Sequence, residues 1–309
     1  LLAEGVRFTN FYANSTVCSP TRASLMTGRY PDKVGVPGVI RHYPNGNFGY
    51  LDESSILLPE ILKDAGYQTA LIGKWHLGVT SPNLPNDRGF DHYKGHLAGM
   101  MNDYYTHLYH GEIFLRENRK LINPEGHATE LFSEWAMEYL DEIRDPDQPF
   151  FMYLAYTAPH DPIQPPDEWL ARVIRREKGI DSARAGIVAL IEHLDDQIGE
   201  VLDHIKQMGL EENTFVIFAS DNGGALRFGA DNGSLRGGKQ DLYEGGIKVP
   251  AGMKWPGRIP AGTTSGEMIL MMDFYPTLAR IGGAGFDHPV DGLDLEPVLT
   301  GNVKSGFSE

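Results

Sequence analysis

Short apolar runs alternate along the chain with longer segments in which apolar residues recur every three or four positions. The short runs have the length and the β-branched or aromatic content of strands, at 6–12, 67–72, 150–156 and 214–219. The longer segments have the periodicity of amphipathic helices, at 56–65, 131–143, 183–208 and 273–281. This alternation predicts an α/β fold with a mostly parallel, mixed central sheet and helices on both faces.

Local signals place several boundaries. Asp273 is positioned to cap the last helix, and Leu1 to Gly5 resembles a final helical turn ended by glycine. Residues 80–127 are rich in His, Tyr and Asn and follow neither periodicity. We therefore expect this segment to be an irregular insertion over one edge of the sheet, near a substrate pocket.

Composition narrows the class of protein. The 309 residues and 41% apolar content suit one large α/β domain with a sizeable core. No run of 18 apolar residues occurs, so no membrane span is predicted. The net charge of −15 argues against nucleic-acid binding. Cys18 is the one cysteine, which excludes an intrachain disulfide and leaves the redox compartment open.

Polar side chains of several kinds follow the predicted strands, where active sites of open α/β sheets lie. They are Cys18 and Arg22 after the first strand, Lys74 and His76 after the second, His160 after the third, and Asp221 and Asn222 after the fourth, with Lys239 further on. Each residue taken alone has a simpler interpretation: the lysines would be solvated surface residues, the histidines would have a structural role, and Asp-Asn-Gly would form a turn. Their joint occurrence at one rim of the sheet indicates an active site.

Cys18 has a distinctive local setting. Ser19 is positioned to cap a short helix, with Pro20 in its first turn, residues 22–27 as its body and Gly28 as its end. A helix N-terminus favours anions, and an arginine one turn on adds fixed positive charge. The alternative interpretation is a small buried core cysteine.

Three segments resemble signatures of the type I sulfatases. Residues 18–29, Cys-Ser-Pro-Thr-Arg-Ala-Ser-Leu-Met-Thr-Gly-Arg, are similar to the first signature, residues 73–78 to the second, and residues 221–224 to the metal-binding strand end. The resemblance extends over essentially the whole chain. It implies an arylsulfatase-like sulfuric ester hydrolase of the alkaline-phosphatase-like superfamily, with residues 1–309 as its catalytic domain.

The resemblance implies a specific chemistry. A maturation enzyme oxidises the signature cysteine of this family to formylglycine, so Cys18 would be the precursor of the nucleophile. One hydroxyl of the hydrated aldehyde attacks the sulfur of a small-molecule or glycan sulfate ester and displaces the alcohol. The other hydroxyl then loses its proton, and sulfate leaves as the aldehyde re-forms. An unmodified thiol cannot follow this elimination route.

The resemblance also implies roles for the other catalytic candidates. Arg22 would orient the diol. Lys74 and His76 would contact the sulfate and the diol, with His76 as the base for elimination. His160 and Lys239 would bind the sulfate oxygens and assist the departing alcohol as general acid.

A divalent cation is implied as well, Ca²⁺ or alternatively Mg²⁺, held by Asp221, Asn222 and the residue at Cys18. The family has a further pair of adjacent carboxylates upstream of Gly5, which the sequence does not contain, and a smaller C-terminal subdomain that is largely absent. We therefore expect a catalytic domain incomplete at both ends, which binds metal weakly. Asp195-Asp196 is no substitute, because it lies within a predicted helix.

A cluster of imidazoles offers a second metal hypothesis, zinc, at His92, His96, His107 and His110. Gly95 and Gly99 disfavour a rigid helical pair, and no cysteine is near. The neighbouring tyrosines favour a pocket rim for a sugar ring or an aryl group instead, with Asp103 and His107 as possible substrate contacts.

Two other functions remain open at this stage. One is a phosphate or phosphonate monoester hydrolase of the same superfamily. The other is an unmodified, non-catalytic homologue that binds sulfated glycans. Relatives are often periplasmic, secreted or lysosomal, and the sequence does not choose among these compartments.

Overall fold

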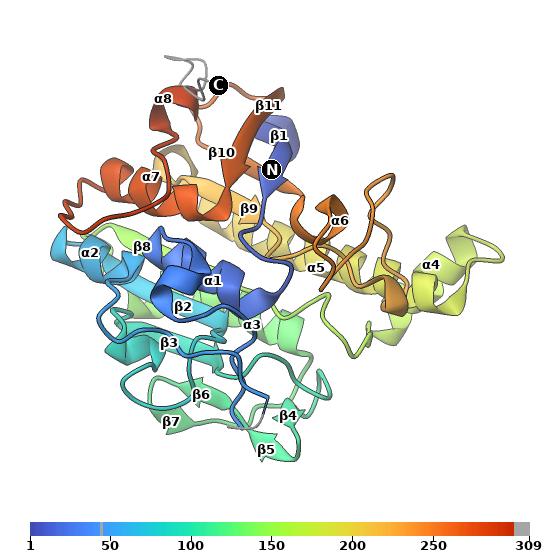
Figure 1. Cartoon of the computed structure of the whole chain (residues 1–309). Coiled ribbons are helices and arrows are strands. Elements are labelled where there is room, and N and C mark those ends of the chain that lie inside the picture. Colours follow the sequence, from blue (N-terminus) through green and yellow to red (C-terminus); the bar gives the residue numbers. More distant parts are fainter. Residues whose placement is uncertain (44–45, 300–309) are drawn as a thin grey trace.

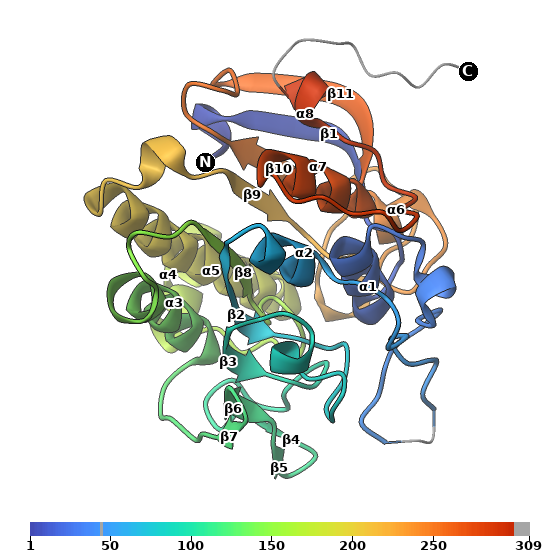
Figure 2. The same ribbon diagram turned by 90° about the vertical axis from the view of Figure 1, so that its left-hand side faces the viewer.

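The computed structural model describes residues 1–43 and 46–299. Its strands form two mixed sheets, an upper and a lower one in Figure 1, and helices lie on both sides of them (Figure 2). The predicted α/β class with mixed strand directions is confirmed. The expectation of one, mostly parallel sheet is wrong. The described strands form two larger sheets and a separate hairpin, and most of their pairs are antiparallel.

The upper sheet has the order β11-β1-β10-β9, with β1 (Val6–Tyr12), β9 (Val216–Ala219), β10 (Ala251–Lys254) and β11 (Thr263–Leu270). β1 runs parallel to β11 and antiparallel to β10, and β10 is antiparallel to β9. The sequence predicts β1 and β9. It does not predict β10, which is short, or β11, whose first half is polar and largely exposed.

The lower sheet has the order β7-β6-β3-β2-β8, with β2 (Gln68–Lys74), β3 (His92–His96), β6 (Leu115–Glu117), β7 (Lys120–Leu121) and β8 (Phe150–Ala155). β2 is parallel to β3 and β8, and all of β2 after Gln68 is buried. A separate hairpin pairs β4 (Leu108–Tyr109) with β5 (Glu112–Ile113). Residues 80–127 thus hold more regular structure than expected, because strands of two to five residues are too short to show a periodicity.

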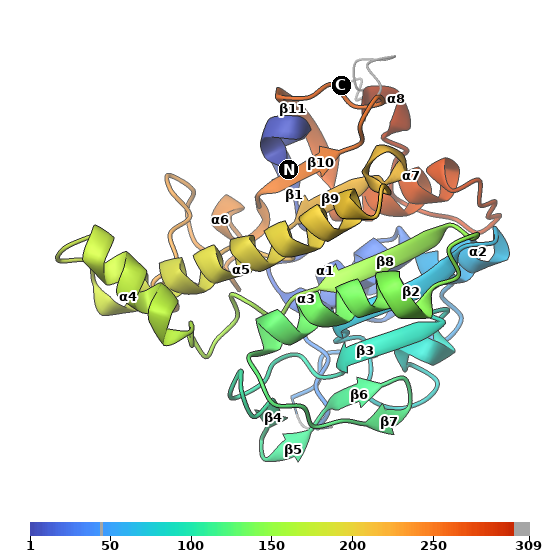
Figure 3. The ribbon, with the colours of Figure 1, turned by 180° about the vertical axis from the view of Figure 1, so that it is seen from behind.

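Helices cover both sides of the sheets. α3 (Ala128–Glu138) and α5 (Ser182–Gln207) lie on the side seen in Figure 3. The opposite side carries α1 (Cys18–Thr27), α2 (Leu58–Asp64) and α7 (Phe274–Ile281). The shorter or peripheral helices are α4 (Asp167–Arg176), α6 (Glu244–Ile247) and α8 (Glu296–Leu299). The helix predicted at 131–143 is α3 followed by one π-helical turn over Tyr139–Ile143.

Helix α1 begins earlier than its sequence indicates. It starts at Cys18 with Val17 as N-cap residue, so the prediction of a Ser19 cap is wrong. The Ser19 hydroxyl instead accepts a hydrogen bond from the Ile40 backbone N–H at 3.1 Å. Gly28 ends the helix in the left-handed conformation, as predicted.

Gly5 and Asp273 have other structural roles than the helix end and the helix cap that the sequence predicts. Residues Leu2–Glu4 form a 3₁₀ turn, and Gly5 is extended rather than left-handed. A Cβ at Gly5 would lie 2.1 Å from the Met253 carbonyl oxygen, so close packing on β10 accounts for this glycine. The Asp273 carboxylate accepts hydrogen bonds from the N–H groups of Leu270 and Leu293, both at 2.8 Å, and does not bond the first turn of α7.

The core beneath α1 fixes the end of β2. Trp75 is fully buried against Phe90 and packs in one cluster with Met26 of α1. Its indole N–H donates to the Asn83 carbonyl at 2.8 Å. Within the described residues, no helix has the length and apolar character needed to span a membrane.

Candidate active site

Four of the predicted catalytic residues line one cavity of about 150 Å³: Cys18, His76, His160 and Lys239. They come from the start of α1, from the segments after β2 and β8, and from the loop before α6. The other two, Arg22 and Lys74, are buried beside it, and Arg22 Nη1 donates to the Lys74 carbonyl at 2.8 Å. Six residues spread over 221 positions of sequence are therefore brought together.

Cys18 is 4% exposed at the first position of α1. Burial alone would raise the pKa of its thiol. The positive charges of Lys74 and Lys239, together with the imidazoles of His160 and His76, outweigh burial and hold the pKa well below its ordinary value. The environment at position 18 therefore favours a negatively charged group.

The two lysines of the site have no carboxylate within ion-pair distance among the described residues. Lys74 is 2% exposed, and burial lowers its pKa although Cys18 and Asp221 favour its charged form. An uncompensated buried cation is costly unless a ligand neutralises it. The two lysines are thus suited to an anionic ligand, although the net charge of the protein is negative.

His76 is held in one tautomer by the backbone. Its Nε2 lies 2.9 Å from the Ile40 carbonyl oxygen, and because a carbonyl only accepts, Nε2 carries the proton. Its Nδ1 is buried and has no hydrogen-bond partner among the described residues. Burial lowers the pKa of His76 to about 4, so the ring is neutral at pH 7 and Nδ1 offers a free lone pair.

His160 is anchored through Nδ1, whereas His76 is anchored through Nε2. Nδ1 lies 2.8 Å from the Asp161 carbonyl oxygen and 3.2 Å from the Asp161 carboxylate. The Tyr104 hydroxyl in turn donates to the His160 carbonyl at 2.9 Å. A ring anchored through Nδ1 leaves Nε2 available to the cavity.

Arg22 contacts residues from two other elements. Nε and Nη2 both lie 3.1 Å from Oδ2 of Asp221, and Nη1 lies 3.1 Å from the Tyr153 hydroxyl. Burial opposes the charge of Arg22, but Tyr153, Asp221 and Cys18 hold its pKa above the ordinary value. Arg22 therefore positions Asp221 and adds positive charge next to Cys18.

Asp221 and Asn222 present two oxygen donors suited to a hard cation. Oδ1 of Asn222 is buried without a hydrogen-bond partner, and its Nδ2 donates to the Gly223 carbonyl at 3.0 Å. Such an orphaned oxygen fits a calcium ligand. Across the described residues, no three His, Cys, Asp or Glu side chains are grouped to hold a metal. The donors present thus fit part of a calcium site.

The candidate zinc histidines have separate structural environments. His92 stacks on Tyr139, His96 Nδ1 donates to the Ala98 carbonyl at 3.2 Å, and His107 Nε2 donates to the Gly126 carbonyl at 2.9 Å. His110 instead packs on Tyr109, which lines the cavity. The described residues therefore do not support the zinc hypothesis, and Asp195-Asp196 lies exposed on α5 as expected.

The comparison with protein families agrees with this geometry. A family model described as Sulfatase matches residues 1–284. The chain belongs to the sulfatase family. It is 33% identical to the N-acetylgalactosamine-6-sulfatase of Canis lupus familiaris over 323 residues, and 32% identical to the arylsulfatase J of Mus musculus over 316 residues. These alignments cover 97% and 99% of this chain, and 60% and 52% of those proteins.

A similar solved structure is that of Ps i-CgsB in complex with k-i-k-neocarrahexaose. It superposes with a TM-score of 0.89 at 32% identity, covering 97% of this chain and 69% of that one. The chain spans about 60% of the length of the curated N-acetylgalactosamine-6-sulfatases it matches.

Several site residues of this sulfatase-family chain lie outside the signature segments. Tyr153 lies within β8 and was hidden in an apolar run, while Asp161 directly follows His160. The cavity is also lined by Arg41, His42 and Tyr109, and the rings of His42 and Tyr109 meet edge to face with centroids 4.9 Å apart. No motif identifies these residues in the sequence.

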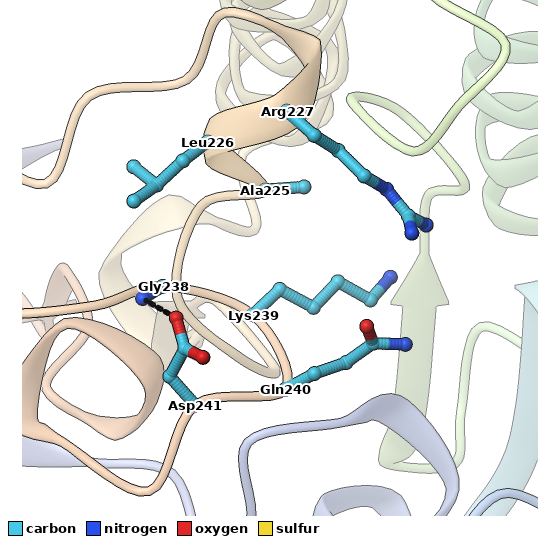
Figure 4. Close-up of a pocket in the computed structure, with 7 residues that line it drawn as sticks. All are labelled: Ala225, Leu226, Arg227, Gly238, Lys239, Gln240 and Asp241. Carbon is cyan, nitrogen blue, oxygen red and sulfur yellow. Dashed lines mark hydrogen bonds between the residues drawn. The ribbon is translucent and has the colours of Figure 1, made fainter.

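A second cavity of about 160 Å³ adjoins the first. Both are lined by Arg227, Lys239 and Gln240, so these three side chains form a shared wall. In Figure 4 the polar ends of the three side chains lie on the same side of the cavity.

Proposed function

We propose that this sulfatase-family protein hydrolyses the sulfate ester of a sugar to an alcohol and inorganic sulfate. The observation that carries the proposal is the position of Cys18 at the start of α1, beside two imidazoles and two lysines. Neither lysine has a carboxylate partner in the part of the chain that the structure describes. The names of the relatives support a sulfated sugar as substrate. The paired rings of His42 and Tyr109 at the cavity suit the face of a sugar.

Formylglycine formed from Cys18 would supply a hydroxyl nucleophile that attacks the ester sulfur. Its formation requires a maturation enzyme as partner. The surrounding residues fit this use: Lys74 and Lys239 bind the sulfate oxygens and stabilise the charge that develops on them. Arg22 keeps the start of α1 next to β2 through the Lys74 carbonyl.

Departure of the alcohol requires a proton donor on the ester oxygen. His160 has this role in our proposal, because Asp161 anchors its Nδ1 and leaves Nε2 to the cavity. Lys239 is a second donor on the same cavity wall. Release of sulfate then requires a base, which is Nδ1 of His76.

Asp221 and Asn222 would hold Ca²⁺, or alternatively Mg²⁺, next to position 18. When bound, the ion would polarise the sulfate and lower the pKa of the nucleophilic hydroxyl.

The test compares turnover of an aryl sulfate with that of the matching aryl phosphate, using protein produced with a formylglycine-generating enzyme. We expect the sulfate to be preferred, and Cys18→Ala to abolish turnover. A strong preference for phosphate would favour the phosphate or phosphonate monoester hydrolase. Binding of sulfated glycan without any turnover would favour the non-catalytic homologue.

A further inference from the structure

Arg227 lies in a short 3₁₀ turn, Leu226–Phe228, a few residues after Asp221 and Asn222, which follow β9. Its guanidinium stacks on the Phe228 ring, with Cζ 4.7 Å from the ring centroid. The side chain lines both the cavity that contains Cys18 and the adjoining cavity. A ligand that reached from Cys18 into the second cavity would therefore pass Arg227.

Arg227 makes no hydrogen bond or ion pair with the described residues. Other exposed arginines differ among themselves: Arg176 and Arg280 each contact two carboxylates, whereas Arg258 also lacks an acidic partner among the described residues. What distinguishes Arg227 is that its side chain lines both cavities. The acidic residue of the second cavity, Asp241, accepts the Gly238 N–H at 2.9 Å (Figure 4). In a chain of net charge −15, an arginine at a cavity wall without an acidic partner is suited to an anionic ligand.

Gln240 provides an independent sign of function on the same wall. Its backbone has φ of +80°, which is rare outside glycine, and its N–H donates to the Thr16 carbonyl at 3.1 Å. Strained non-glycine conformations cluster at ligand sites. The conformation directs the amide group to the same side as the ends of Arg227 and Lys239 (Figure 4).

We propose that Arg227 selects substrates that carry a second anionic group next to the scissile sulfate. The second cavity holds the adjoining sugar unit, Gln240 bonds its hydroxyls, and Arg227 binds its carboxylate or second sulfate. The inference rests on the proposed function and deepens it, because it names the substrate class as an anionic glycan rather than a singly charged ester.

Two galactosamine disaccharides with one scissile sulfate test this inference. One has a neutral adjoining sugar, and the other has a uronic acid there. Dissociation constants are measured by calorimetry in the Cys18→Ala background, because turnover does not interfere there. Three proteins are compared in this background: one with Arg227 intact, one with Arg227→Gln and one with Arg227→Lys. Arg258→Gln is the matched control, because Arg258 is also exposed, stacks on Trp255 at 4.8 Å and lines neither cavity.

We expect Arg227→Gln to weaken binding of the acidic disaccharide by about tenfold or more, as for loss of one charge-assisted hydrogen bond. The dissociation constant of the neutral disaccharide should change little in Arg227→Gln, and Arg258→Gln should bind both disaccharides about as the protein with Arg227 intact does. Arg227→Lys should recover part of the lost affinity for the acidic disaccharide. Equal weakening for both disaccharides would place Arg227 on the scissile sulfate and overturn the inference, as would no weakening for either. Failure of the mature protein to turn over any sulfate ester would overturn the proposed function, while these binding constants would still decide the role of Arg227.

Discussion

The guanidinium of Arg22 holds one oxygen of Asp221, Oδ2, through Nε and Nη2, each at 3.1 Å. Both contacts use Oδ2 of Asp221, and Oδ1 of the adjacent residue in sequence, Asn222, is buried without a hydrogen-bond partner among the described residues. The carboxylate is oriented before any ligand arrives, since Arg22 is only 5% exposed and is also fixed by the Lys74 carbonyl. The ion pair thus orients the carboxylate of Asp221, which we propose as a calcium ligand together with Asn222.

Calcium should therefore stabilise the protein through these two residues. We expect Ca²⁺ to raise the melting temperature, and Asn222→Leu to remove most of this increase because it replaces the orphaned oxygen by an apolar group. Asn213→Leu, in the turn before β9, is a control outside the site. A calcium-induced increase that is the same in Asn222→Leu and in the unmodified chain would contradict this assignment.

We expect His76 to act in its neutral form, as the base for the release of sulfate. We expect His76→Gln, whose amide can still donate to the Ile40 carbonyl, to lower kcat by about 10²- to 10⁴-fold and to change KM less. Steady-state kinetics on an aryl sulfate measure both constants. A kcat within about threefold of the original would exclude this role.

Gly99 should be required for the orientation of His76. A Cβ at residue 99 would lie 2.2 Å from Nε2 of His76, so Gly99→Ala forces the ring away from the Ile40 carbonyl. We expect kcat to fall by about tenfold or more while the protein stays folded. The control is Gly285→Ala, since a Cβ there meets nothing within 4 Å. Equal kcat values for the two variants would show that the ring tolerates the displacement.

Stability should fall as the pH decreases from about 6.5 towards about 4. Burial lowers the pKa of His76 and of His127 to about 4, and that of His96 to about 3, from an ordinary value of 6.5. In this interval the unfolded chain binds protons that the folded chain excludes, so each histidine costs up to about 1.4 kcal/mol per pH unit.

Urea unfolding at several pH values measures this dependence. His96→Gln should make it less steep, because one buried neutral histidine is removed away from the reacting groups. His110→Gln, at an exposed position, is the control. An unchanged pH dependence in His96→Gln would contradict burial as the cause.

The sequence predicts which polar residues lie close together, because the ends of strands bring them together. Lys74 is the last residue of β2, and His160 and Asp221 follow β8 and β9. The apolar runs of these strands are visible in the sequence, and Cys18 begins a helix with a recognisable glycine end. Their proximity then follows from the topology of the sheets, and two of them, Cys18 and His160, line the same cavity.

The start of α1 and the roles of Arg227 and Tyr153 depend on contacts between residues far apart in the sequence, which the sequence pattern does not show. The start of α1 was misplaced because Ser19 bonds the distant Ile40 N–H rather than its own helix. Arg227 was missed because an exposed arginine carries no signal until the structure shows both the cavities beside it and the absence of an acidic partner among the described residues. Tyr153 was missed because a strand tyrosine suits an apolar run.

The central claim is that Cys18 is the precursor of the nucleophile. Mass spectrometry of the tryptic peptide spanning residues 8–22, from protein that turns over an aryl sulfate, tests it most directly. The account predicts a peptide in which the thiol has been replaced by an aldehyde, in a fraction that rises in proportion to kcat across preparations. Full activity from protein whose Cys18 thiol is entirely intact would contradict it.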